Sequence, residues 1–176
     1  GGWAGIYGDQ KYGGMGLPSV VTSCFNEYFG SAGLSCSLLF LMNQGQIDAL
    51  EKHANEDIKN IFLPKLNSGE WTGTMNLTEP HAGSDVGALT TKAEKNSDGS
   101  YAITGQKIYI SWGEHDLSNN ICHLVLARLP NSPKGSKGVS LFIVPKYIQN
   151  QEDEWLLENN VKAISVEKKM GMHGSP

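Results

Sequence analysis

The sequence predicts an α+β protein in which a helical N-terminal segment precedes an antiparallel β-sandwich or β-barrel. Apolar residues recur at helical spacing up to Leu66, and from Trp71 onward they alternate with polar residues along short runs. Short strands joined by turns are typical of antiparallel sheets, whereas βαβ units would alternate strands with helices. We therefore predict part of a helical N-terminal domain over residues 1–70 and a truncated β-domain over residues 71–176.

Three helices are predicted in the first half. Pro18 suits a first helical turn, and the apolar spacing that follows it continues to Gly30. A more thoroughly apolar helix covers residues 34–50. Asn55 caps a third helix through its side-chain oxygen. Pro64 is expected to bend or end this helix because proline has no N–H group to donate.

The second half is predicted to be strands and turns. Residues 71–78 alternate in the way of a half-buried strand. Asp98-Gly99 indicates a hairpin, and Thr104-Gly105 marks the next turn. The other predicted strands cover residues 89–94, 108–111, 121–129, 139–144 and 162–166. Residues 149–160 are polar around Trp155 and are predicted to form a surface loop packed by its own apolar side chains. No Rossmann unit is predicted, because the run Gly13-Gly14-Met15-Gly16 lacks the G-x-G-x-x-G spacing and follows no strand.

Composition excludes several classes of protein. A net charge of −4 and the absence of a basic stripe argue against nucleic-acid binding. The longest apolar run, residues 34–42, is too short to span a bilayer. No signal peptide opens the sequence, although the missing initial Met allows for a segment upstream. Cys24, Cys36 and Cys122 are expected to be small buried residues rather than a disulfide or zinc framework, and the cytoplasm is the expected location.

The run Leu77-Thr78-Glu79-Pro80-His81-Ala82-Gly83-Ser84-Asp85-Val86-Gly87 is the most informative stretch. Pro80 ends the strand, and the small residues after it expose backbone N–H groups that can lie against a flat or anionic ligand. An ordinary turn between strands is the alternative. A nucleophile elbow is not supported, because G-x-S-x-G is missing. Metal binding by His81 and Asp85 lacks a further ligand nearby.

A second motif, Ile108-Tyr109-Ile110-Ser111-Trp112-Gly113, follows the turn at Thr104-Gly105. If this motif is a strand, Tyr109 and Ser111 share one face of it. An aromatic ring beside a hydroxyl group suits a flat heterocycle, because the ring covers its face and the hydroxyl meets an edge nitrogen. The alternative is a tyrosine that simply packs on a sheet.

Taken together, the motifs resemble the acyl-CoA dehydrogenase family of flavoenzymes. The resemblance is collinear and covers essentially the whole chain. It is carried by Tyr12-Gly13-Gly14-Met15-Gly16-Leu17, Leu63-Pro64-Lys65-Leu66-Asn67-Ser68-Gly69-Glu70, residues 78–85, residues 105–111, Lys137-Gly138-Val139-Ser140-Leu141-Phe142-Ile143-Val144-Pro145 and Lys169-Met170-Gly171-Met172-His173-Gly174-Ser175.

The resemblance implies a helical N-terminal domain and a β middle domain that sandwich FAD with a C-terminal helical bundle, which is absent here. Thr78 would bond near the pyrimidine end of the flavin. Tyr109 stands where the family often has Trp, and Ser111 where it often has Thr bonded to flavin N5. Ser84 and Ser175 match positions that contact the acyl-CoA thioester. The implied cofactor-binding residues are Met75, Leu77, Thr78, Gly83, Ser84, Tyr109, Ile110 and Ser111.

The family removes a proton alpha to the thioester and transfers a beta hydride to flavin, which yields a trans-enoyl-CoA. Its catalytic base is a carboxylate in the C-terminal domain, so no catalytic residue is assigned here. Glu79 is expected to be structural, because it lies beside Pro80 at the entrance of a loop. The run Glu114-His115-Asp116 is expected to be a polar loop and a subfamily marker.

The motifs around Trp112 and Arg128 most resemble a bacterial branch that includes the methylthiopropanoyl-CoA dehydrogenases. The resemblance implies acyl-CoA as substrate, an electron-transfer flavoprotein as electron acceptor and a homo-oligomer at full length. The isolated fragment is expected to be inactive and to bind FAD weakly. The alternatives are an acyl-CoA oxidase that uses oxygen, a non-catalytic flavin- or ligand-binding protein, and a β-domain interaction module.

Overall fold

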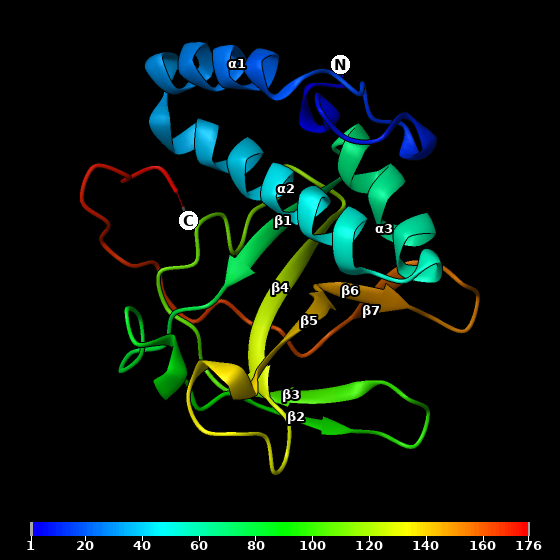
Figure 1. The fold of residues 1–176 in the computed structure, drawn as a ribbon, viewed down its shortest axis with the longest axis vertical. Helices are drawn as coiled ribbons and strands as arrows, with labels where there is room; N and C mark the ends of the chain where they lie inside the picture. Colours follow the sequence, from blue (N-terminus) through cyan, green and yellow to red (C-terminus); the bar gives the residue numbers. More distant parts are fainter. Residues whose placement is uncertain (1, 176) are drawn as a thin grey trace.

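The computed structural model describes residues 2–175, and the first half of the chain is helical (Figure 1). Its elements are η1 (Trp3–Gly5), η2 (Gln10–Tyr12), α1 (Ser19–Ala32), α2 (Leu34–His53) and α3 (Glu56–Ser68). The three predicted helices are confirmed, although α1 continues beyond Gly30 and Pro18 precedes its first turn. Asn55 caps α3 as predicted, because its Oδ1 accepts a hydrogen bond from Ile58 N at 2.9 Å.

Pro64 does not end or interrupt α3, so that prediction was wrong. The helix continues to Ser68 with Pro64 in its interior. A proline there costs about 3 kcal/mol. Each large apolar side chain that is fully buried contributes about 1.5–3 kcal/mol. Three such side chains flank the proline: Phe62, Leu63 and Leu66. Their burial outweighs the cost of the proline.

The second half forms a five-stranded mixed sheet and a separate hairpin. The strands are β1 (Trp71–Asn76), β2 (Lys92–Lys95), β3 (Tyr101–Thr104), β4 (Asn120–Arg128), β5 (Val139–Pro145), β6 (Tyr147–Gln149) and β7 (Trp155–Glu158), with short turns η3 (Val86–Ala88) and η4 (Ser136–Gly138) between them. Strand β4 pairs with β1 in parallel and with β5 in antiparallel orientation. Strand β2 joins β4 through the pair Lys92–Arg128 and forms the predicted hairpin with β3.

The α+β class is therefore confirmed, but the sheet is mixed rather than antiparallel. Parallel neighbours need a long crossover. Here the chain between β1 and β4 supplies it and contains the β2–β3 hairpin. An alternation of apolar and polar residues reveals strands without revealing their direction relative to one another.

Strand β1 is buried on both faces, where one exposed face was predicted. Helix α2 covers one face so closely that a Cβ added to Gly73 would overlap the Gln46 side chain. On the other face, Thr74 hydrogen-bonds to buried His123. Helices α2 and α3 pack against this end of the sheet (Figure 1). The core between them contains Tyr12, Ile47, Leu50, Phe62, Leu63, Leu66, Trp71, Cys122 and Leu124.

Residues 149–160 form a packed structure rather than an independent surface loop. Strands β6 and β7 pair as an antiparallel hairpin. Trp155 packs against Phe62, with ring centroids 5.7 Å apart, and against Trp71 at 4.8 Å. The hairpin is thus attached to the helical core, and the predicted packing by its own apolar residues was wrong.

Two further predictions fail. Residues 159–175 contain no helix or strand, so the strand over 162–166 is not formed, and Ile164 and Val166 are each 76% exposed. Of the three cysteines, Cys122 is buried as predicted, whereas Cys24 and Cys36 are exposed. Within residues 2–175, no helix combines the length and apolar character needed to cross a membrane.

Candidate functional site

The segment 77–87 leaves the end of β1 as a loop, as predicted. Glu79 N donates to Ala82 O at 2.8 Å, and Ala82 N donates back to Glu79 O at 3.0 Å. This reciprocal pair closes a tight turn. The turn brings Gly83 against Thr78, because an ideal Cβ on Gly83 would lie 3.5 Å from Thr78 Cγ2.

The Glu79 carboxylate is buried and surrounded by donors. Oε2 accepts from N and Oγ1 of Thr90 at 2.7 and 2.9 Å, and Oε1 accepts from N and Oγ1 of Thr91 at 3.0 and 2.5 Å. Lys107 Nζ donates to Oε1 at 2.9 Å. Burial raises the pKa of Glu79, but the hydrogen bonds outweigh burial and lower the pKa to about 2. Such a carboxylate is a poor proton acceptor, and its buried hydrogen bonds support the prediction that Glu79 is structural.

Lys107 is a site residue that sequence reasoning missed. Its side chain is 8% exposed. Besides Glu79, its Nζ donates to the carbonyl oxygen of Leu77 at 3.1 Å. The available signal was charge complementarity, because the first motif contains Glu79 and Asp85, and Lys107 stands directly before the second motif. Pairing these charges would have predicted the contact between the motifs.

Residues 108–111 do not form the predicted strand. Tyr109 and Trp112 have φ angles of 60° and 56°, which extended strands do not allow. The segment is held by single bonds instead of a ladder, with Ile108 N donating to Thr78 O at 2.9 Å. The inference that Tyr109 and Ser111 share one face of a strand is therefore wrong. The two motifs nevertheless meet through this bond, as a common ligand site requires.

The predicted cofactor residues differ in exposure. Ser84 is exposed and the Tyr109 side chain is 53% exposed. The others are partly buried: Met75, Leu77, Thr78, Gly83, Ile110 and Ser111. Within residues 2–175, the hydroxyl groups of Thr78, Ser84 and Ser111 form no hydrogen bond to the protein. The two motifs, joined by the Ile108–Thr78 bond, thus carry an accessible aromatic ring and hydroxyl groups that are free to bond, which suits a flat, polar-edged heterocycle such as flavin.

Ser175 lies in a different environment from Ser84. It is 2% exposed, and its Oγ accepts a hydrogen bond from Trp112 N at 3.3 Å. The Trp112 indole donates to Ser35 O at 2.7 Å, and Lys169 Nζ donates to Ile110 O at 3.2 Å. Residues 169–175 thus pack on the second motif and on the start of α2. The hydroxyl of Ser175 retains a proton to donate, and its predicted contact with the thioester stays a prediction.

The run 114–116 lies in a polar hollow of about 300 Å³. Leu117 N donates to His115 Nδ1 at 3.2 Å, which leaves the proton of the neutral ring on Nε2, directed at Thr72 Oγ1 3.1 Å away. Burial lowers the pKa of His115. Lys146 forms an ion pair with Glu114. These contacts confirm a polar loop that supports β1.

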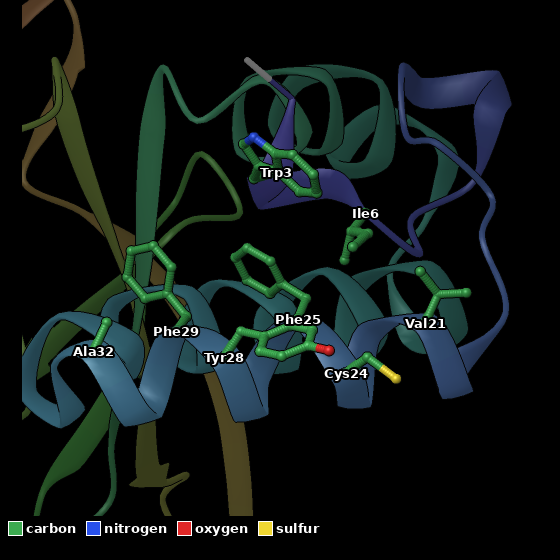
Figure 2. Close-up of a pocket in the computed structure, with 8 residues that line it drawn as sticks. All are labelled: Trp3, Ile6, Val21, Cys24, Phe25, Tyr28, Phe29 and Ala32. Atoms are coloured by element: carbon green, nitrogen blue, oxygen red, sulfur yellow. The ribbon is translucent and has the colours of Figure 1, made fainter.

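Neither of two other features adds chemistry to the site. Within the part of the chain that the structure describes, no three His, Cys, Asp or Glu side chains are grouped to hold a metal ion. A hollow of about 360 Å³ lies between η1 and α1, where Trp3 and Ile6 face α1 (Figure 2). Phe25 stacks on Trp3 with centroids 5.5 Å apart. This hollow contains none of the predicted cofactor or substrate residues.

Comparisons with known proteins agree with these motifs. The chain is 46% identical over 175 residues to a 3-methylmercaptopropionyl-CoA dehydrogenase of Ruegeria pomeroyi, covering 99% of this chain and 30% of that protein. It is 42% identical over 160 residues to a butyryl-CoA dehydrogenase of Syntrophomonas wolfei, covering 90% and 26%. The chain thus spans less than a third of the length of these curated relatives.

Solved structures show the same likeness. An acyl-CoA dehydrogenase of Bacillus anthracis complexed with FAD superposes with a TM-score of 0.76 at 28% identity, over 99% of this chain and 27% of that one. A butyryl-CoA dehydrogenase of Megasphaera elsdenii superposes with a TM-score of 0.77 at 26% identity, over 99% and 43%. Residues 1–70 match the acyl-CoA dehydrogenase N-terminal domain and residues 74–176 the middle domain. These two matches account for nearly the whole sequence, and the chain belongs to the acyl-CoA dehydrogenase family.

Proposed function

We propose that the full-length protein catalyses the FAD-dependent α,β-dehydrogenation of an acyl-CoA thioester to the trans-enoyl-CoA and passes the electrons to an electron-transfer flavoprotein. The observation that carries the proposal is the bond from Ile108 N to Thr78 O, which joins the two motifs into one half-exposed surface. Membership of the family and the flavin in the Bacillus anthracis relative support it.

In this proposal bound FAD would supply the hydride acceptor, and the residues of this chain would bind and orient it. Thr78 and Ser111 supply hydroxyl groups for the edge of the ring, and Tyr109 covers part of its face. A hydroxyl group near the atom that receives the hydride stabilises the charge that develops there. Glu79 is already saturated by donors and is a poor base, and in this proposal the base that removes the α-proton lies outside residues 2–175.

The test uses the product of the full-length gene. We expect purified protein to show flavin absorbance and to reduce a dye or an electron-transfer flavoprotein with at least one member of a panel of butyryl-, isovaleryl- and 3-methylmercaptopropionyl-CoA. Stoichiometric hydrogen peroxide without another acceptor would identify an oxidase instead. Flavin without turnover would identify a non-catalytic binding protein, and a colourless protein would contradict the proposal altogether.

A matched pair of variants tests the assignment of Ser111. Ser111→Ala should lower kcat about tenfold or more, because a donor to the reacting ring is lost. The control Ser165→Ala changes an exposed hydroxyl outside the site and should leave kcat unchanged. Equal kcat values for the two variants would contradict the assignment of Ser111 to the flavin site.

The proposal extends to partners and location. We propose that the full-length protein is a homo-oligomer and works in the bacterial cytoplasm. Three cysteines without disulfides suit a reducing compartment. Residues 1–176 alone should bind FAD weakly and show no turnover with any acyl-CoA. Turnover by this fragment with a dye acceptor would contradict the assignment of the base to another part of the protein.

A further inference from the structure

The backbone on both sides of Thr78 is fixed by hydrogen bonds. The carbonyl oxygen of Leu77 accepts from Lys107 Nζ at 3.1 Å. The carbonyl oxygen of Thr78 accepts from Ile108 N at 2.9 Å, and Glu79 N donates to Ala82 O at 2.8 Å. Three of the four polar groups in the two peptide units that flank Thr78 therefore have partners within the protein.

The fourth group is the N–H of Thr78. It forms no hydrogen bond within residues 2–175. It belongs to the same peptide unit as the carbonyl of Leu77, and in a trans peptide these two groups point in opposite directions. Because Lys107 holds the carbonyl oxygen, the N–H points away from Lys107. The ammonium group thus sets the direction of a free donor.

The charge on Lys107 also strengthens that donor. A hydrogen bond from a charged group polarises the carbonyl that accepts it, and hydrogen bonds along a chain of dipoles reinforce one another. The Lys107 and Glu79 side chains are 8% and 2% exposed, so water screens this interaction little. The Glu79 carboxylate is shared with four donors from Thr90 and Thr91, which leaves the ammonium incompletely neutralised.

We propose that Lys107 is a positioning residue that, through the carbonyl of Leu77, orients and polarises the Thr78 N–H toward an acceptor atom of the bound flavin ring and so favours the reduced form. This inference rests on the proposed function. In that reaction the substrate gives up its β-hydrogen with two electrons to the ring and its α-hydrogen as a proton to a base outside this chain. The ring gains one negative charge, and an N–H donor backed by a cation stabilises that charge.

Two variants distinguish a polarising role of Lys107 from a purely structural role in which Lys107 only holds the two motifs together. Lys107→Met removes the cation, and the affinity for reduced relative to oxidised FAD should fall about tenfold, which is about 30 mV for a two-electron couple. Glu79→Gln removes the counter-charge but keeps Lys107, and the same ratio should rise. If Lys107 and Glu79 only held the two motifs together, both variants would change the ratio of reduced to oxidised FAD affinity in the same direction.

The experiment measures the flavin midpoint potential of the full-length holoenzyme by reductive titration against a reference dye, together with FAD affinity by fluorescence. Lys107→Arg keeps the charge and should shift the potential less than Lys107→Met. The control Lys52→Met breaks an exposed ion pair with Asp48 on α2 and should leave the potential unchanged. If Lys107→Met does not fold, Glu79→Gln still decides the question, because its flavin potential should rise only if Lys107 acts through its charge.

The outcomes separate the inference from the proposed function. A wild-type protein without flavin would overturn the proposed function and the inference with it. A flavin-containing wild type whose potential is unchanged in Lys107→Met, or shifts in the same direction in Glu79→Gln, would overturn the inference alone. Opposite shifts, with Lys107→Arg closer to wild type, would support it.

Discussion

The indole rings of Trp71 and Trp155 pack edge to face, with centroids 4.8 Å apart and an interplanar angle of 67°. Trp71 begins β1, and Trp155 begins the second strand of the β6–β7 hairpin. Phe62 of α3 contacts both rings. The three rings therefore join the helical half, the main sheet and the hairpin at one point. Edge-to-face pairs of this kind contribute about 0.5–1.5 kcal/mol beyond the area they bury.

Trp155→Ala should lower the free energy of unfolding of the full-length protein by about 3 kcal/mol, because it leaves a cavity beside Phe62 and Trp71. The matched control is Leu156→Ala on the same strand. Leu156 is 68% exposed, so its truncation should change stability by less than about 0.5 kcal/mol. Urea unfolding followed by tryptophan fluorescence and by circular dichroism measures both. Equal destabilisation by the two variants would show that the hairpin is not anchored through Trp155.

Glu79 predicts a dependence of stability on pH. Its pKa falls from 4.5 to about 2 on folding. The carboxylate therefore contributes stability above pH 4.5, and this contribution is lost as the pH falls from 4.5 toward about 2. Glu79→Gln should be less stable than wild type by a few kcal/mol at pH 7, at about 1.4 kcal/mol per pKa unit.

The difference in stability between Glu79→Gln and wild type should shrink as the pH is lowered from 4.5 toward about 2. Melting temperatures of the two proteins measure this difference. The control Glu94→Gln alters an exposed carboxylate of β2 and should show no such convergence. A constant difference between pH 7 and pH 2.5 would contradict the low pKa of Glu79.

His123 predicts a second dependence, at higher pH. Burial lowers its pKa to about 4. Thr74 Oγ1 donates to Asn76 Oδ1 at 2.7 Å, so it accepts from His123 Nδ1, 2.7 Å away. This bond places a proton on Nδ1, and burial keeps the ring neutral by disfavouring a second proton. The unfolded state takes up the proton first, and stability should fall as the pH drops from about 6.5 to about 4, by about 2 kcal/mol at pH 5.

His123→Asn should abolish most of that slope in melting temperature between pH 7 and pH 5, even if the variant is less stable throughout. His53→Asn at the exposed end of α2 is the control and should retain the slope. An unchanged slope in His123→Asn would assign the effect to another group.

Local periodicity predicted the helices and most strands because burial on one side of an element leaves a repeat in the sequence. It missed the course of α3 beyond Pro64, because the cost of one proline is small beside the burial of Leu63 and Leu66. It also missed the parallel pairing of β1 with β4. The relative direction of two paired strands depends on the crossover that connects them, and the alternation of apolar and polar residues carries no information about that connection.

The candidate site, too, could be predicted from the sequence only in part. The motifs around Thr78 and Ser111 were recognisable, because their residue types and order are distinctive. Residues 108–111 were misread as a strand, since alternation alone does not reveal the positive φ of Tyr109. The role of Lys107 was invisible to local pattern, because its partners Leu77 and Glu79 lie 30 and 28 residues earlier.

A glycine of β1 and a glycine of α2 should respond in opposite ways to alanine. In Gly73→Ala, the new Cβ would lie 2.9 Å from Gln46 Cβ and overlap the Gln46 amide oxygen. Gln46 is 2% exposed, and rotation of its side chain would not move its Cβ away from the new methyl group. Helix α2 must shift away from β1, and the free energy of unfolding should fall by about 1–3 kcal/mol.

Gly45 precedes Gln46 on α2 but is exposed, and a Cβ there meets no atom within 4 Å. Gly45→Ala should therefore raise stability by about 0.5–1 kcal/mol, because alanine favours the helix over the unfolded chain. Thermal and urea unfolding of the two variants measure the contrast. If Gly73→Ala were as stable as Gly45→Ala, α2 could not lie as close to β1 as the Gln46–Gly73 contact requires, and the burial of both faces of β1 would have to be abandoned.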